Sequence, residues 1–245
     1  MMRDALPAGT STADAAIRWR RLVDAASAPY RAAGRFAYHF ARGKLTRDPV
    51  FRALVERGLL VDGRYVDIGC GQALLASLLA ATDGVRASHY HGVELMASDV
   101  ARAQAAFGTL PLAHRLVNDD MRRATLPPCD CVVILDVLHY VDHAAQAALL
   151  GRVRDALAAG GAGRRRLLLR VGDMSERRGF AASQWVDRVV TRLRGHRISP
   201  TWGRPLADWV ALLEGLGFAV QPLPMSQGTP FANVLLVADL KADPP

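Results

Sequence analysis

From residue 64 to residue 171, short apolar runs alternate with segments of helical periodicity, and this rhythm restricts the fold more than any other feature. Apolar runs bounded by turn residues are typical of buried strands. Repeated strand–helix units build a parallel sheet with helices on both faces. Strands are expected at Arg64–Ile68, His89–Glu94, Arg115–Asn118, Asp130–Asp136 and Arg166–Val171, and helices at Gln72–Thr82, Ala97–Phe107 and Asp142–Ala159.

The N-terminal part of the chain has a different pattern. Residues 1–11 are rich in small residues, proline and glycine, which predicts a disordered lead-in. The next segment, to Gly58, is helical in pattern, with Ile17 and Val23 among its apolar positions. Within it, Asp48 followed by Pro49 is typical of a helix start. The sequence therefore predicts a helical N-terminal extension, or lid, over residues 1–60.

The C-terminal part completes the sheet. A helical insert is expected near residues 175–202, and a helix at Pro205–Gly215 follows it. Two apolar runs, Phe218–Leu223 and Phe231–Leu240, are expected to pair as antiparallel strands. The sequence thus predicts one α/β domain over residues 61–245. Its core is a doubly wound, mostly parallel seven-stranded sheet with an antiparallel C-terminal strand.

A glycine-rich turn joins the first strand to the first helix of this domain. The segment reads Val-Asp-Ile-Gly-Cys-Gly over residues 66–71. Glycines at such a turn let a ligand approach the backbone, and the following helix N-terminus favours a negatively charged group. Asp67 would repel a pyrophosphate but attract a cationic amino group, and Leu74 stands where dinucleotide sites usually have Gly or Ala. A ligand with an amino acid end therefore fits better than a dinucleotide.

This segment resembles motif I of the class I S-adenosylmethionine-dependent methyltransferases, which have a Rossmann-like fold. The resemblance covers about Arg64 to Leu240. It implies that Asp67, Gly69, Cys70 and Gly71 line the methionine end of S-adenosyl-L-methionine, with S-adenosyl-L-homocysteine as the product.

The same resemblance assigns residues after the later strands, where ligands bind in open α/β sheets. Glu94, with Leu95 beside it, ends the second strand, and its carboxylate would accept both ribose hydroxyl protons. After the third strand, Asp120 would accept from the adenine amino group and Met121 would pack on the ring, with Asp119 as the alternative to Asp120. Asp136 ends the fourth strand and would face cofactor and acceptor together.

His139 is the candidate general base because it follows the fourth strand and because imidazole titrates near neutral pH. The alternative interpretation is that it packs at the strand end. His143 is expected to be exposed on the next helix, and His39 and His196 remain weaker candidates. His89 and His91 lie before the site and are interpreted as structural.

Aromatic side chains gather in the segments expected to cover the site. They could form the roof of an apolar acceptor pocket or simply pack helices on the sheet, and the sequence leaves both interpretations open. Trp209 is expected in the core. The covering aromatic residues are Tyr30, Phe36, Tyr38, Phe40, Trp185 and Trp202.

The net charge and the cysteine content of the chain indicate whether it binds nucleic acid or a metal. The formal net charge is +8, which could favour a polyanion. However, the excess is mostly Arg in an Ala-rich chain, and the basic residues are interpreted as spread along it, so nucleic acid is disfavoured. The dense run Arg164–Arg166 is interpreted as a solvated strand entry. The three cysteines predict neither a disulfide framework nor a metal site, since Cys129 and Cys131 should face opposite sides of a strand.

These features predict a cytoplasmic enzyme without a membrane span or a metal, with a homodimer compatible. The acceptor is expected to be a small, partly apolar molecule methylated at oxygen. The segment after the fourth strand lacks the Asn/Asp-Pro-Pro-Tyr/Phe pattern of amino-directed nucleic-acid methyltransferases. Three alternatives stay open: an RNA or protein methyltransferase, a nicotinamide oxidoreductase, and a non-catalytic cofactor-binding scaffold that needs a partner.

Overall fold

A computed structural model describes residues 12–173, 202–225 and 233–242 of the chain. The predicted lead-in, the core of the helical insert, Trp185 and His196 lie outside the described residues. Within them, no helix is long and apolar enough to cross a membrane.

The described strands form one sheet in the order β3-β2-β1-β4-β5-β7-β6. The strands from β3 to β5 are parallel, whereas β7 runs antiparallel to both β5 and β6. The prediction of a doubly wound seven-stranded sheet with an antiparallel C-terminal strand is confirmed. The strands are β1 (Gly63–Ile68), β2 (Ala87–Glu94), β3 (His114–Asn118), β4 (Cys131–Leu135), β5 (Arg166–Gly172), β6 (Phe218–Pro224) and β7 (Asn233–Leu240).

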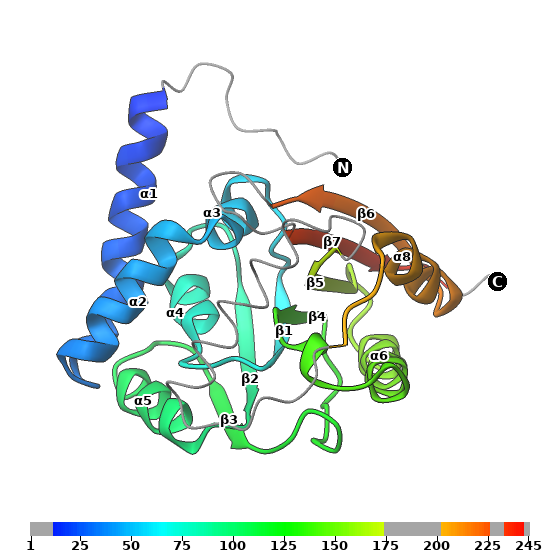
Figure 1. Ribbon diagram of the computed structural model, residues 1–245. Helices are drawn as coiled ribbons and strands as arrows, with labels where there is room; N and C mark the ends of the chain where they lie inside the picture. Colours follow the sequence, from blue (N-terminus) through cyan, green and yellow to red (C-terminus); the bar gives the residue numbers. More distant parts are fainter. Residues whose placement is uncertain (1–11, 174–201, 226–232, 243–245) are drawn as a thin grey trace.

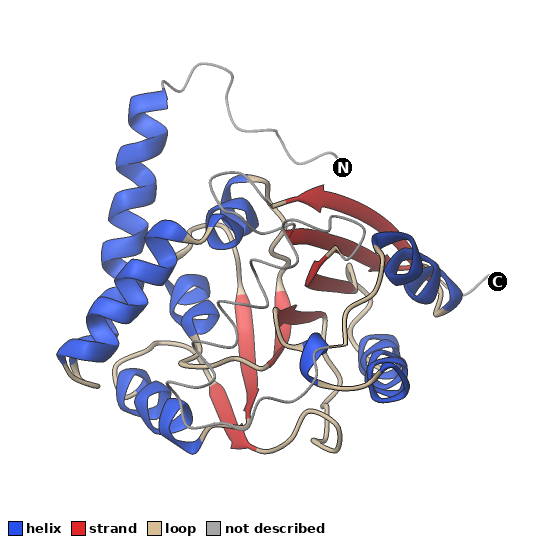
Figure 2. Ribbon diagram, viewed as in Figure 1, coloured by secondary structure: helices blue, strands red, loops and turns tan. Residues whose placement is uncertain are grey.

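Helices cover both faces of the sheet (Figure 2). Side chains of β4 alternate between two apolar layers, with Cys131 and Val133 in one and Val132 and Ile134 in the other, as the two-residue period of a strand requires. The first layer lies under α4 (Leu74–Ala81) and α5 (Ala97–Phe107) and the N-terminal helices. The second lies under α6 (His143–Ala158) and α8 (Leu206–Gly215), and holds the predicted core residue Trp209. Cys129 belongs to this second layer, so the two cysteines do lie on opposite sides, but because Cys129 precedes β4; within a strand, residues two apart would share one face.

The N-terminal extension is helical, as predicted. It consists of α1 (Thr12–Ser27), the short 3₁₀ helix η1 (Ala28–Arg31), α2 (Arg35–Arg47) and α3 (Pro49–Glu56). Figure 1 shows α1 and α2 outside α4, and α1 contacts both α2 and α4. Asp48 caps α3 by accepting from the Val50 backbone N–H at 3.1 Å. Among the apolar positions of α1, Ile17 is 47% exposed, whereas Trp19 and Val23 are buried.

The strand order reverses between β2-β1 and β4-β5, so the carboxyl ends of β1 and β4 meet at a crevice. Ligands of open α/β sheets bind at such a switch point. One predicted boundary differs there. The first helix begins at Leu74 rather than Gln72, because Ala73 has a left-handed backbone with φ +56°. Gln72 and Ala73 therefore belong to the turn.

Candidate functional site

The turn between β1 and α4 is built on positive φ angles. Gly69 has φ +71° and Gly71 has φ +55°, which only glycine adopts at little cost. A Cβ atom at Gly69 would lie 2.5 Å from a methyl group of Val137, whereas a Cβ atom at Gly71 would have nothing within 4 Å. Gly69 is therefore required by packing, and Gly71 leaves open space beside the turn.

Asp67 lies beneath this turn and is buried. Its carboxylate accepts a hydrogen bond of 2.6 Å from the Tyr90 hydroxyl. Burial raises the pKa of Asp67 to about 7; the Tyr90 hydrogen bond opposes this rise and the charge of Glu94 adds to it. A desolvated carboxylate of this kind gains most from a cationic group, which would hold it in the charged form.

Glu94 is fixed at the end of β2 by two backbone donors. One carboxylate oxygen accepts from the Gly71 N–H at 2.8 Å and the other from the Met96 N–H at 2.8 Å. A carboxylate has about four acceptor positions, so each oxygen can still accept from a ribose hydroxyl. Glu94 thus joins the glycine turn to the carboxyl end of β2.

Gln72 is a site residue that the sequence did not indicate. Its side-chain nitrogen donates to Asp99 at 3.3 Å, and its backbone carbonyl accepts from the Tyr30 hydroxyl at 2.7 Å. The side-chain oxygen of Gln72 is buried without a hydrogen-bond partner among the described residues. Such an orphaned acceptor is costly unless a ligand donates to it. Only its place in the turn could have signalled this role.

A second charged group lies across the crevice. Asp136, at the end of β4, has a left-handed backbone with φ +59°, and Arg170 of β5 donates to its carboxylate at 2.8 Å. Arg170 also donates to Asp48 at 2.8 Å, and Lys44 pairs with Asp48 at 2.7 Å. The charges of Asp136 and Asp48 outweigh burial and raise the pKa of Arg170. This network ties the N-terminal helices to the strand ends, and the sequence did not reveal it.

A cavity of about 140 Å³ connects these groups. Three acidic and two basic residues line it, which leaves one negative charge for a cationic ligand to neutralise, and the apolar wall comes from α2, α3 and β4. The donor set and the orphaned Gln72 oxygen therefore fit a ligand with an amino group and a sulfonium. The lining residues are Phe40, Lys44, Phe51, Asp67, Gly69, Cys70, Gly71, Gln72, Leu74, Leu75, Asp99, Leu135, Asp136 and Arg170.

Comparison with protein families matches residues 66–161 to the model of a methyltransferase domain. Residues 66–161 therefore form a methyltransferase domain. The matched residues run from the middle of β1, through the glycine turn, to the end of α6. No curated protein sequence matches the chain.

Solved structures share the fold of this methyltransferase at low sequence identity. Magnesium protoporphyrin IX methyltransferase from Synechocystis PCC 6803, solved with bound SAH, is 21% identical with a TM-score of 0.57, over 92% of this chain and 94% of that one. An O-methyltransferase family protein from Burkholderia thailandensis is 16% identical with a TM-score of 0.61, over 87% and 63%. A small RNA methyltransferase is 14% identical with a TM-score of 0.55, over 83% and 26%.

The residues predicted to hold adenine lie outside the cavity of the methyltransferase. The carboxylate of Asp120 is gripped by Arg122, whose hydrogen bonds lower its pKa. Asp119 pairs with Arg123 at 2.8 Å. Leu95 is 61% exposed, and Met121 is half-buried. The structure brings Asp67, Gly69, Cys70, Gly71 and Asp136 together around the cavity. Glu94 adjoins it through its hydrogen bond with the Gly71 N–H, whereas Leu95, Asp120 and Met121 do not line it.

His139 lies in the 3₁₀ turn η2 (Leu138–Tyr140) that follows β4. Its backbone carbonyl accepts from the Trp202 N–H at 2.8 Å, and its half-buried ring lies 4.2 Å from that of Tyr140. His139 does not line the cavity. His143 is exposed on α6, as predicted, and contacts the carbonyl of Gly203.

Some of the aromatic side chains pack helices on the sheet, whereas others lie at or near the cavity. Tyr30 is fully buried and fixes the turn through Gln72, so it packs rather than forming a roof. Phe40 lines the cavity, and its ring stacks with that of Phe36 at 6.2 Å. Phe36 is 68% exposed. Trp202 is also exposed and contacts the His143 ring by its edge.

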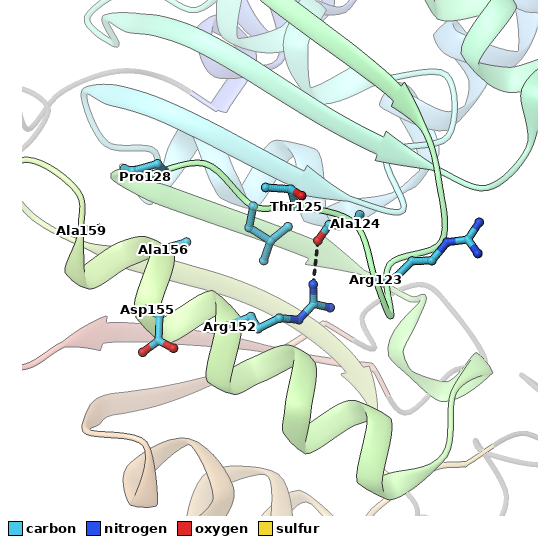
Figure 3. Close-up of a pocket in the computed structure, with 9 residues that line it drawn as sticks. Arg123, Ala124, Thr125, Pro128, Arg152, Asp155, Ala156 and Ala159 are labelled. Atoms are coloured by element: carbon cyan, nitrogen blue, oxygen red, sulfur yellow. Dashed lines mark hydrogen bonds between the residues drawn. The ribbon is translucent and has the colours of Figure 1, made fainter.

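A second, shallower cavity of about 430 Å³ lies between α6 and the loop after β3 (Figure 3). Arg152 crosses its floor and donates to the carbonyls of Ala124 and Met121, each at 2.6 Å. None of the predicted site residues lines this cavity. Among the described residues, no group of three or more His, Cys, Asp or Glu side chains could hold a metal ion.

Proposed function

We propose that this methyltransferase transfers a methyl group to a small, partly apolar acceptor at an oxygen atom. The observation that carries the proposal is that one cavity joins the acidic glycine turn to an apolar wall. Asp67 and the turn lie on one side, and Phe40 and Phe51 of the N-terminal helices and Leu135 of β4 lie on the other. The reacting ends of a cofactor and of an apolar acceptor would therefore meet at the same cavity.

The proposed cofactor residues are those of the resemblance, with Gln72 and Asp99 added. S-adenosylmethionine, when bound, supplies a methyl group on a sulfonium sulfur. Asp67 and the Gln72 side-chain oxygen would accept from its amino group, and Glu94 would accept from the ribose. The full set is Asp67, Gly69, Cys70, Gly71, Gln72, Glu94, Leu95, Asp99, Asp120, Met121 and Asp136.

The protein's own contribution is positioning, exclusion of water and removal of a proton from the acceptor. The network of Arg170, Asp136 and Asp48 holds α3 against the strand ends, which would close the acceptor side of the cavity. We propose His139 as the general base, because η2 places it directly after β4, next to the crevice.

The remaining parts of the proposal concern organisation. Residues 1–60 would act as the lid and residues 61–245 as the catalytic domain. A cytoplasmic location and a homodimer stay predictions. An RNA acceptor is the alternative that the charge of the chain supports, and a cofactor-binding scaffold is the alternative without turnover.

The first test is calorimetric titration with S-adenosylhomocysteine, with reduced nicotinamide dinucleotide as the control ligand. Asp67→Asn should weaken binding strongly. Asp130→Asn is the matched control, because Asp130 is also a buried carboxylate. It lies at the opposite, amino-terminal ends of the parallel strands, where it accepts from the Arg64 and Gly161 N–H groups. Methyl transfer is then assayed on phenols, hydroxy acids and amines. Absence of binding by the folded protein would refute the proposed site.

A further inference from the structure

Most of the net positive charge of this chain is concentrated in its N-terminal helices. The N-terminal helices, residues 12–58, contain ten Lys and Arg against four Asp and Glu, a net charge of +6. Residues 59–173, which contain β1 to β5, have twelve of each and are neutral. The basic residues themselves are distributed along the chain, as interpreted, but the excess of positive over negative charge is largest in the N-terminal helices. The run at Arg164–Arg166 is also not simply solvated, since Arg166 is buried against Asp239.

Most of the basic side chains in these N-terminal helices form no ion pair within the described structure. Three basic residues of the segment pair with carboxylates: Arg42, Lys44 and Arg52. Six exposed arginines form no ion pair with any described carboxylate, so their field extends into solvent. They are Arg18, Arg20, Arg21, Arg35, Arg47 and Arg57.

Two aromatic side chains of α2, Phe36 and Phe40, connect this basic surface to the cavity, and together they are called the aromatic step. Phe36, Phe40 and Lys44 are spaced four residues apart along α2 and lie on one face of the helix. Phe40 and Lys44 line the cavity, and Phe36 stacks on Phe40 from outside. The first and last residues of α2 are Arg35 and Arg47, both exposed and unpaired with described carboxylates. Phe36 is largely exposed, although the Arg102 guanidinium lies 5.4 Å from its ring centroid, so the rest of the ring surface faces solvent next to a positive field.

We infer that α2 is the acceptor-recognition element, and that it selects a ring-bearing, apolar molecule that carries negative charge, such as a carboxylate. This inference rests on the proposed function and names the acceptor class. The acceptor's ring lies along Phe36 and Phe40. Its anionic group is attracted by the N-terminal helices, with Arg35 and Arg47 closest in sequence to the aromatic step.

The same observations favour a small anion over a polymer. The cavity of about 140 Å³ admits part of a small molecule, whereas a nucleotide of a polymer would have to unstack to enter it. The arginines are also distributed over three helices rather than along one groove. Their main effect is therefore long-range steering, which raises association rates by roughly 10- to 1,000-fold and weakens with salt.

The test uses a matched pair of dyes, because the acceptor itself is unidentified. Anilinonaphthalene sulfonate carries a negative charge, and phenylnaphthylamine has the same rings without it. Both are titrated by fluorescence into protein saturated with S-adenosylhomocysteine, after calorimetry has established that the cofactor product binds. Failure at the calorimetric step refutes the proposed function. Failure at the dye step refutes only the acceptor class.

Two comparisons between variants show which residues are responsible for binding of the dyes. Arg35→Gln with Arg47→Gln is compared with Arg115→Gln with Arg164→Gln, which removes the same charge from exposed positions outside the N-terminal helices. Phe36→Ala is compared with Ile17→Ala, another exposed apolar side chain. We expect the first double variant to weaken binding of the sulfonate about tenfold at low salt, without affecting the neutral dye. Phe36→Ala should weaken both dyes.

Equal binding of the two dyes, or equal effects of the two double variants, would overturn the inference. Bulk transfer RNA is added as a competitor in the same assay. If the RNA binds the protein with a steep salt dependence and displaces the sulfonate, the basic helices recognise a polyanion and the small-acceptor inference is wrong.

Discussion

Arg170 of β5 donates to Asp136 at the end of β4 with its Nε atom at 2.8 Å, while Asp136 keeps a left-handed backbone with φ +59°. The same guanidinium binds Asp48, which is 122 positions away in the sequence and caps α3. One buried side chain therefore both holds a strained strand end and anchors the N-terminus of α3. Arg suits this role because its planar fork can bind two carboxylates at once.

Arg170→Gln should loosen the N-terminal helices and weaken binding of S-adenosylhomocysteine, because two half-buried or buried carboxylates lose their partner. Breaking such a buried pair costs about 3–5 kcal/mol. Arg166→Gln is the matched control, since Arg166 is buried on the same strand and grips Asp239, at the opposite end of β5. Both variants should lower stability, but only the first should raise hydrogen exchange over α2 and α3 and reduce binding. Equal effects would exclude the anchoring role.

Gly69→Ala should destabilise the fold more than Gly71→Ala does. Both substitutions place a side chain at positive φ, at roughly 1–2 kcal/mol each, but only the first Cβ meets Val137 at 2.5 Å. Adding Val137→Ala should recover part of the stability of Gly69→Ala and none of that of Gly71→Ala. Thermal unfolding measures these differences. Gly71→Ala should instead weaken cofactor binding, because its methyl group enters the open space of the cavity.

The pKa of Asp67, raised to about 7 in the folded state from an ordinary value of 3.8, predicts two opposite pH dependences. The unfolded chain loses this proton at lower pH than the folded chain, so the stabilising contribution is complete below pH 3.8 and is lost as pH rises through about 7. Binding of the cationic amino group should strengthen over the upper part of the same range, as Asp67 ionises. Denaturant titrations and calorimetry between pH 5 and 8 measure both, and Asp67→Asn should flatten both curves.

Tyr90→Phe provides a separate test of the same carboxylate. The Tyr90 hydroxyl donates to Asp67 and thereby lowers its pKa. Without this donor, the pH midpoint for binding of S-adenosylhomocysteine should move upward, while affinity at high pH falls only modestly. A midpoint that does not move would show that another group controls the pH dependence.

His139→Ala should spare cofactor binding and reduce methyl transfer by roughly 100- to 10,000-fold if His139 removes the acceptor's proton. His143→Ala is the comparison, because His143 is exposed four residues later on α6. A general base also imposes a rising limb on the pH–rate profile, which the alanine variant should lose. Full activity in His139→Ala would remove this residue from the mechanism.

The local part of the fold and of the site was predictable. Strand and helix periodicity located every described strand to within a few residues, and glycine spacing located the turn with Asp67 below it. These features depend on neighbouring residues only. The start of α4 was misplaced because the left-handed Ala73 carries no sequence signal comparable to glycine.

The sequence by itself determined the alternating units, the glycine turn and the carboxylate beneath it, because backbone preferences and side-chain periodicity act over a few residues. Only the tertiary structure decided that Arg170 joins Asp48 to Asp136, that Tyr30 and Gln72 support the turn, and that Asp120 is held by Arg122 rather than placed in the cavity. It also showed that six arginines of residues 12–58 form no ion pair with a described carboxylate. Ion pairs between distant segments depend on which strands become neighbours, and the charges alone allow many pairings.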